Sequence, residues 1–157
     1  MPVEKIVINA SPIIVLFKAR LEYILPILFK DIVIPEAVLK EISATNDRAA
    51  TEIGKVKWYK VPIIETDKNI MEWNLGKGES SVLSYALHNK NYRAVIDDAA
   101  ARRCAKTFNI RYIGTGSILV LASKKGIINS FDNAIMDLKN AGLWISNGVI
   151  DMLRKKL

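Results

Sequence analysis

Residues 76–127 decide the fold, and they read GKGESSVLSYALHNKNYRAVIDDAAARRCAKTFNIRYIGTGSILVLASKKGI. Apolar residues recur at helical spacing from Val82 to Leu87, and the run 93–96 that follows is typical of a short buried strand. A second helix, a second strand over 110–113 and a third helix follow in the same way. This alternation of strands and helices predicts a parallel sheet with helices on both of its faces.

The N-terminal part of the chain adds two more strand–helix units. Short apolar runs over 5–8 and 32–34 predict buried strands. Ser11 fits the N-cap position of the helix after the first strand, because Pro12 would then occupy the first helical position.

Two further segments predict peripheral structure. Residues 56–64 (VKWYKVPII) have strand propensity, but Pro62 cannot donate to a neighbouring strand and restricts this segment to an edge. From about residue 130 the chain predicts a C-terminal helical extension. Because the 157 residues contain no repeat and no linker, we expect a single domain over 1–157, with a three-layer α/β/α sandwich around a mainly parallel sheet.

The charge balance favours an anionic partner. The formal net charge is +7 and the sequence pI is about 9.5. Nucleic acid is the commonest partner of such a basic domain, although lysines that only solvate the surface explain the charge equally well. A single cysteine, Cys104, excludes an internal disulfide.

The expected location is the cytoplasm. The N-terminal residues 1–5 lack the charged-then-apolar order of a signal peptide, and a lone cysteine suits a reducing compartment. The longest apolar runs are too short to cross a bilayer, so no membrane association is expected.

Polar side chains follow the predicted strands at their carboxyl ends. Asn9 follows the first strand, Asp97 and Asp98 follow the strand over 93–96, and Thr115 follows the last strand. Ligands of open parallel sheets bind beyond these carboxyl ends. The sequence therefore predicts a polar cleft at one edge of the sheet.

Two glutamates could face the same cleft from helices. Glu79 lies in the first turn of its helix, and Glu41 lies at the margin of an apolar helical stripe. Carboxylates gathered in a small space repel one another, and a divalent cation relieves this repulsion. Oxygen ligands completed by water suit Mg²⁺ or Mn²⁺, which would lower the pKa of a bound water and polarise a phosphodiester. This combination indicates a metal-dependent nuclease.

Basic residues on and near the helix that follows the two aspartates support this hypothesis. Arg102, Arg103 and Lys106 lie on that helix, and Arg111 lies in the next predicted strand. They could hold the phosphates on either side of the bond that is cut. An acidic centre with basic surroundings is the charge pattern expected of a nuclease.

Each of these residues also has a purely structural explanation. Adjacent residues in extended backbone point to opposite faces, so we expect one aspartate of the Asp97–Asp98 pair in the cleft and the other as a helix cap. Glu79 could complement the helix dipole alone. Ser11 could act only as a cap, and Thr115 could simply make a turn between two glycines.

In the order and spacing of its motifs the chain resembles the PIN-domain proteins, and within them the small prokaryotic VapC-like toxins. The resemblance spans nearly the whole chain, and its most specific parts are IVINASPIIVLFKA, IVIPEAVLKEI, LGKGESSVLSYAL, AVIDDAAARRCAK and YIGTGSILVLASKKGII. It implies a three-layer α/β/α fold and Mg²⁺- or Mn²⁺-dependent RNA cleavage. VapC-like toxins usually pair with an antitoxin protein that blocks the site, and they often form homodimers.

The resemblance also implies a set of site residues. The acidic positions of the family would fall on Asn9, Glu41, Glu79 and Asp98 (or Asp97), and its Ser/Thr after the first of them on Ser11. Most active members carry Asp where this chain has Asn9, whose carbonyl oxygen can ligate a metal but adds no negative charge.

Two functions remain open on the sequence. The first is a metal-dependent ribonuclease of the toxin–antitoxin type. The second is a non-catalytic nucleic-acid-binding or regulatory protein with a degenerate site. A phosphatase or nucleotide-binding protein fits less well, because Asn9 cannot act as the nucleophilic aspartate and no phosphate-binding glycine loop is present.

Overall fold

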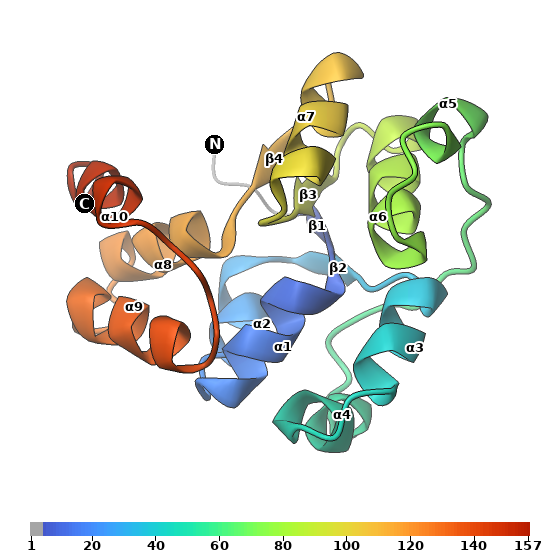
Figure 1. The fold of residues 1–157 in the computed structure, drawn as a ribbon. Helices are drawn as coiled ribbons and strands as arrows, with labels where there is room; N and C mark the ends of the chain where they lie inside the picture. Colours follow the sequence, from blue (N-terminus) through green and yellow to red (C-terminus); the bar gives the residue numbers. More distant parts are fainter. Residues whose placement is uncertain (1–4) are drawn as a thin grey trace.

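A four-stranded parallel sheet lies at the centre of the molecule (Figure 1). The computed structural model describes residues 5–157, so most of the N-terminal segment used above to exclude a signal peptide lies outside the described residues. The strand order is β2-β1-β3-β4, and the strands are β1 (Lys5–Ile8), β2 (Asp31–Val33), β3 (Arg93–Val95) and β4 (Tyr112–Ile113). The predicted α/β class with a mainly parallel sheet is confirmed, and every pairing among the four strands is parallel.

The strands are apolar because helices cover both faces of the sheet. Ile6, Val7 and Ile8 of β1 are fully buried. The helices of the described part are α1 (Ala10–Lys18), α2 (Ile24–Leu28), α3 (Glu36–Ser43), α4 (Arg48–Glu52), the 3₁₀-helix η1 (Ile53–Lys55), α5 (Lys68–Met71), α6 (Lys77–His88), α7 (Ala99–Thr107), α8 (Thr115–Lys124), α9 (Phe131–Asn140) and α10 (Asn147–Arg154). Helix α6 packs on β1 and β3 beside α7, whereas α1 contacts α9 and α2 contacts α8 in the other layer.

The order of the strands defines a crevice between β1 and β3. The chain leaves β1 for β2 on one side, and after β2 it crosses back over β1 to reach β3 and then β4. Connections between parallel strands of one sheet are right-handed. The β1-to-β2 and β2-to-β3 connections run across the sheet in opposite directions, so α1 and α6 lie on opposite faces of the sheet. The chain therefore diverges at the carboxyl ends of β1 and β3, which is where open α/β sheets bind their ligands.

Residues 56–64 do not form the predicted strand. This segment lies beside β2 and makes one parallel bridge, in which Lys60 N–H donates to the Ile32 carbonyl and Ile34 N–H donates to the Lys60 carbonyl, both at 2.9 Å. Two residues later Pro62 has no N–H to continue the ladder, although its carbonyl accepts from Glu36 N–H at 3.0 Å. The strand propensity of residues 56–64 therefore yields only one bridge, because Pro62 lacks the N–H that the next ladder hydrogen bond needs.

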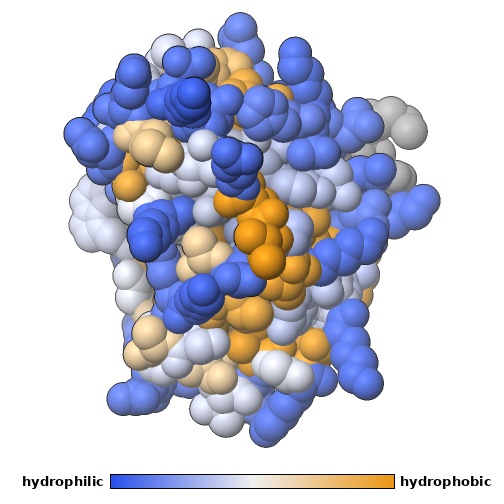
Figure 2. Space-filling model, turned by 90° about the vertical axis from the view of Figure 1, so that its right-hand side faces the viewer, coloured by the Kyte–Doolittle hydropathy of each residue, from blue (hydrophilic) through white to orange (hydrophobic). Residues whose placement is uncertain are grey.

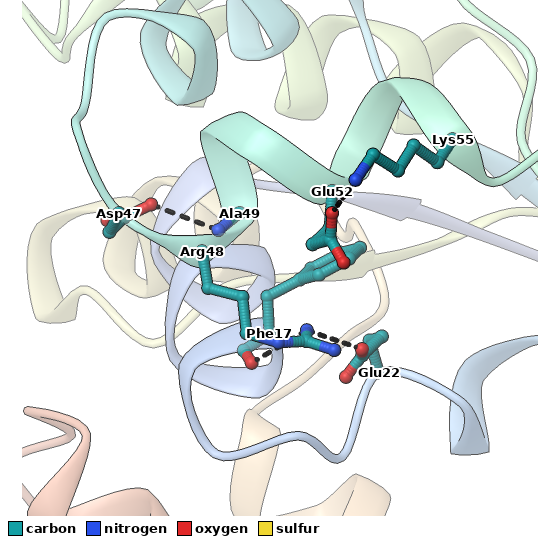
Figure 3. Close-up of polar contacts among 7 residues, drawn as sticks. All are labelled: Phe17, Glu22, Asp47, Arg48, Ala49, Glu52 and Lys55. Atoms are coloured by element: carbon teal, nitrogen blue, oxygen red, sulfur yellow. Dashed lines mark hydrogen bonds and ion pairs between the residues drawn. The ribbon is translucent and has the colours of Figure 1, made fainter.

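Helix α4 is fastened to the end of α1 by one arginine (Figure 3). The Nη1 atom of Arg48 donates to Glu22 Oε1 at 2.7 Å and to the Phe17 carbonyl at 3.2 Å. Asp47 caps α4 by accepting from the Ala49 N–H at 3.1 Å. Because α4 packs against α3 as well as α1, this anchor steadies the helix that carries Glu41.

The C-terminal helices pack closely against α8. A β-carbon on Gly116 would lie 2.7 Å from Leu153 Cδ1, so the Leu153 side chain of α10 can take this position against the first turn of α8 because residue 116 is glycine. Among residues 5–157, no helix has both the length and the apolar composition that a membrane span requires.

Candidate metal centre

Asn9 lies in the crevice at the end of β1. It continues the strand in extended conformation, and its N–H donates to the Val95 carbonyl of β3 at 3.2 Å. Helix α1 begins at the next residue, so Asn9 occupies the N-cap position that the sequence assigned to Ser11. That assignment was wrong by two residues, because β1 runs directly into α1, and Ser11 lies exposed in the first turn.

The side chain of Asn9 is only 4% exposed, and its Oδ1 atom has no hydrogen-bond partner among the described residues. Buried carbonyl oxygens almost always have a partner, because leaving one unpaired costs free energy of desolvation. An unpaired carbonyl oxygen at this place is the kind of atom that a cation or a bound water would satisfy.

Glu79 is held over the same crevice by the start of α6. It is the third residue after the N-cap Gly76, which is where a glutamate can reach back to the N-cap N–H. Burial raises the pKa of Glu79 above its ordinary value of 4.5, and the charges of Asp98 and then Glu41 raise it further. The N–H of Gly76 and the side-chain amide of Asn9 act on this pKa in the opposite direction. Residues far apart in sequence therefore meet around Glu79.

Glu41 reaches the same place from α3. Its Oε1 atom accepts a hydrogen bond from the Gly78 N–H at 3.0 Å, in the first turn of α6. The N-terminal end of a helix favours such a negative charge. A β-carbon on Gly78 would lie 2.7 Å from the same Oε1 atom, so the carboxylate can take this position only because residue 78 is glycine.

Asp98 is the aspartate that influences Glu79. It is the N-cap of α7, where its Oδ2 atom accepts from the Ala101 N–H at 2.9 Å, and its residue is exposed. Asp98 therefore both caps α7 and lies near Glu79. The sequence analysis had expected one aspartate to be the cap and the other to lie in the cleft.

Asp97 points toward α8. Its Oδ1 atom accepts from the Thr115 N–H at 2.9 Å, and its Oδ2 atom accepts from the Thr115 hydroxyl at 2.6 Å. Arg102 Nη2 lies 3.6 Å from Oδ1 of the same carboxylate. Thr115 is fully buried and opens α8, which gives it a more definite position than a turn between two glycines.

The oxygen atoms around Asn9 suit a hard divalent cation. Among the described residues, no three His, Cys, Asp or Glu side chains lie close enough to enclose a metal by themselves. Mg²⁺ usually keeps several waters and binds to proteins through one or two carboxylates, so an open arrangement fits it better than a closed one. The residues that could hold Mg²⁺ or Mn²⁺ here are Glu79, Asp98, Glu41 and the Oδ1 atom of Asn9.

The basic residues singled out in the sequence occupy different parts of the molecule. Arg102 donates from Nε to the Ile96 carbonyl at 3.2 Å and lies over the Tyr112 ring, at the same edge as the carboxylates. Arg103 is exposed on α7, and Lys106 lies in the last turn of that helix. Arg111 precedes β4 and so lies at the amino end of that strand, away from the carboxylates. Its Nη2 donates to the Lys90 carbonyl at 2.7 Å. Phosphate binding stays a prediction for all four, and position favours Arg102.

Sequence reasoning missed two cations beside Arg102. Lys124 and Lys156 line the surface beside Arg102 and Gly114. Lys124 is the last residue of α8 and Lys156 follows α10, and only the packing of those helices brings both lysines beside Arg102.

A family model described as a PIN domain, DUF3368, matches residues 5–157 of the chain. No curated protein and no solved structure matches it.

Proposed function

The chain belongs to the PIN-domain family, a family of predicted nucleases, and on this premise we propose that it is a metal-dependent ribonuclease that hydrolyses RNA phosphodiesters. We propose further that it is a single-domain endoribonuclease of the toxin–antitoxin type. The observation that carries the proposal is the meeting of Glu41, Glu79 and Asp98 beside a buried, unpaired amide oxygen of Asn9.

The proposed roles follow from the positions of the side chains. Glu79 and Asp98 would bind the cation, with Glu41 and the Asn9 Oδ1 atom as further ligands. When bound, Mg²⁺ or Mn²⁺ would supply an activated water and polarise the phosphodiester. The backbone N–H groups of Gly78 and Gly76 hold Glu41 and Glu79 at the start of α6.

Asp97 and Thr115 have a supporting role in this proposal. Their paired hydrogen bonds fix the end of β3 to the start of α8, and this connection holds the neighbouring Asp98 in place. Ser11, two residues after Asn9, is exposed in the first turn of α1 and could bind a water or a phosphate oxygen.

The surface next to Glu41 supports an antitoxin or a second copy of the chain as a partner. Figure 2 shows an apolar band on the face that carries α3 and α6, the right-hand side of Figure 1. A groove between these helices is lined by Glu41 and Ile63, among others, and the Ile63 side chain is 83% exposed. A protein covering this groove would also cover Glu41.

Asn9 supports a second candidate function, a nucleic-acid-binding protein that does not cut. A neutral ligand in place of a carboxylate weakens metal affinity, because one negative charge is missing from the site. On this alternative, RNA binding would be sensitive to salt and would survive the substitutions Glu79→Gln and Asp98→Asn.

One experiment separates the two functions. The purified protein, its Asn9→Asp variant and its Glu79→Gln variant are incubated with a varied RNA pool in Mn²⁺ or in EDTA. We expect cleavage by the parent protein in Mn²⁺ and none by Glu79→Gln. Cleavage by Asn9→Asp alone would show that the natural chain is not a nuclease, and cleavage in EDTA would exclude a metal-dependent mechanism.

A further inference from the structure

A groove beside the candidate site combines cations with an exposed tryptophan. One part of it runs along the edge strand β4, from Arg93 past Tyr112 to Arg102, with Lys124 and Lys156 on the opposite wall. The other part continues from Arg102 and Lys156 to the connection between α9 and α10, where Trp144 lies. The two parts share Arg102, Gly114, Ser117 and Lys156, so they form one continuous surface.

The charge along this groove is strongly positive. Its charged lining residues are Arg93, Arg102, Lys124, Lys156 and Asp97, which is four cations against one carboxylate. The Asp97 carboxylate already accepts two hydrogen bonds from Thr115 and forms an ion pair with Arg102. The phosphates of a nucleic-acid strand in the groove would therefore be attracted by four cationic side chains and repelled by one carboxylate.

Trp144 is the most exposed large hydrophobic side chain of the described residues, at 87%. The neighbouring Leu143 and Ile145 are half-buried against the core, so the indole stands out on an anchored connection rather than on a free loop. Val149 and Met152 of α10, also partly exposed, extend the apolar surface next to it. A flat aromatic ring beside cations is the arrangement on which nucleic-acid-binding proteins stack single-stranded bases.

Asp97 lines the groove and is adjacent in sequence to Asp98, which influences Glu79. An RNA strand in the groove would thus pass next to the candidate metal centre. We propose that this groove binds single-stranded RNA next to the cleaved bond, an inference that rests on the function proposed above. One base stacks on Trp144, and the phosphates lie against Arg102, Lys156 and Lys124.

The test measures RNA affinity in EDTA, so that binding is separated from cleavage. A short fluorescent single-stranded RNA is titrated with the parent protein and with Trp144→Ala, Trp144→Phe and the double variant Lys124→Ala/Lys156→Ala. Tyr23→Ala, which removes another exposed aromatic ring, and Lys90→Ala, at the opposite edge of the sheet, are the matched controls.

We expect Trp144→Ala to weaken binding about tenfold and Trp144→Phe to recover most of the loss, because base stacking needs only an aromatic face. The double lysine variant should lower the slope of log affinity against log salt by about 1.4, since each phosphate contact to a single strand contributes about 0.7. The controls should bind as the parent does. Single-stranded DNA should show the same dependence on Trp144, and duplex RNA should not compete.

Unchanged affinity in Trp144→Ala, an equal loss in Tyr23→Ala, or no RNA binding by the parent would overturn the inference. These outcomes can be told apart from a failure of the proposed function. Trp144-dependent binding without Mn²⁺-dependent cleavage refutes the nuclease alone, whereas cleavage with an unchanged KM in Trp144→Ala refutes the groove alone.

Discussion

Both carboxylate oxygens of Asp97 are bound to Thr115, one through the backbone N–H at 2.9 Å and the other through the hydroxyl at 2.6 Å. This pair joins the end of β3 to the first residue of α8. Asp98, one residue further on, lies next to Glu79 instead. Of two adjacent aspartates, the structure thus commits one to holding the edge of the sheet and leaves the other to the crevice.

Breaking the Asp97–Thr115 pair should destabilise the protein without changing the charges around Glu79. We expect Asp97→Asn and Thr115→Val each to lower the free energy of unfolding by about 1–3 kcal/mol, because a charge-assisted hydrogen bond to a buried group is lost. Urea denaturation of both single variants and of the double variant measures the coupling between them. Additive losses would show that the two side chains do not act as a unit.

The position of Glu41 should depend on the glycine beneath it. Gly78→Ala places a β-carbon 2.7 Å from Glu41 Oε1 and must displace the carboxylate from the start of α6. We expect Mn²⁺ affinity, measured by calorimetry, to fall by about tenfold, which is typical when a ligand loses its supporting contact.

Gly76→Ala is the matched control for this experiment. Its β-carbon would lie 3.7 Å from Glu79 Oε1, an ordinary van der Waals distance, so Mn²⁺ affinity should stay close to that of the parent. If both alanine variants bind Mn²⁺ equally well, Glu41 is not part of a metal site.

Asn9→Asp should lower the free energy of unfolding of the metal-free protein and raise its affinity for Mn²⁺. The variant adds a negative charge at a position only 4% exposed and next to Glu79, so in EDTA we expect a loss of roughly 2 kcal/mol of unfolding free energy. Added Mn²⁺ should raise its melting temperature more than that of the parent, because only the folded state binds the ion.

Asn89→Asp, on the exposed C-cap of α6, controls for the change in net charge. Its melting temperature should respond to Mn²⁺ as the parent's does. An equal response in Asn9→Asp would mean that residue 9 does not face a cation site.

The raised pKa of Glu79 predicts a pH-dependent penalty. The folded state disfavours the ionised carboxylate, so the contribution of Glu79 to the stability of the metal-free protein should be fully present below the ordinary pKa of 4.5 and be lost as the pH rises through the raised value. Glu79→Gln removes this ionisation and should melt at a higher temperature than the parent at neutral pH in EDTA.

The difference between Glu79→Gln and the parent should disappear in acid, where both side chains are neutral. Thermal melts across this pH range measure it. A parent protein that is more stable than Glu79→Gln at neutral pH without metal would mean that the Glu79 charge is favourably paired, contrary to the arrangement around Asp98 and Glu41.

The alternation of short apolar runs and helical periodicity was enough to predict the parallel sheet, because strands buried on both faces leave an unmistakable pattern. The same reasoning placed Asn9, Asp97 and Asp98 at carboxyl ends of strands. It failed for residues 56–64, where Pro62 interrupts the ladder after one bridge, and for Ser11, because no loop separates β1 from α1.

The sequence by itself determined which residues stand at the ends of the strands, since periodicity fixes where an element stops. Only the tertiary structure decided how Asp97 and Asp98 divide their roles, because this depends on the direction in which α7 and α8 leave the sheet. The groove with Trp144, Lys124 and Lys156 was equally beyond the sequence. Its residues carry no local pattern, and they come together only through the packing of α9 and α10 against α8.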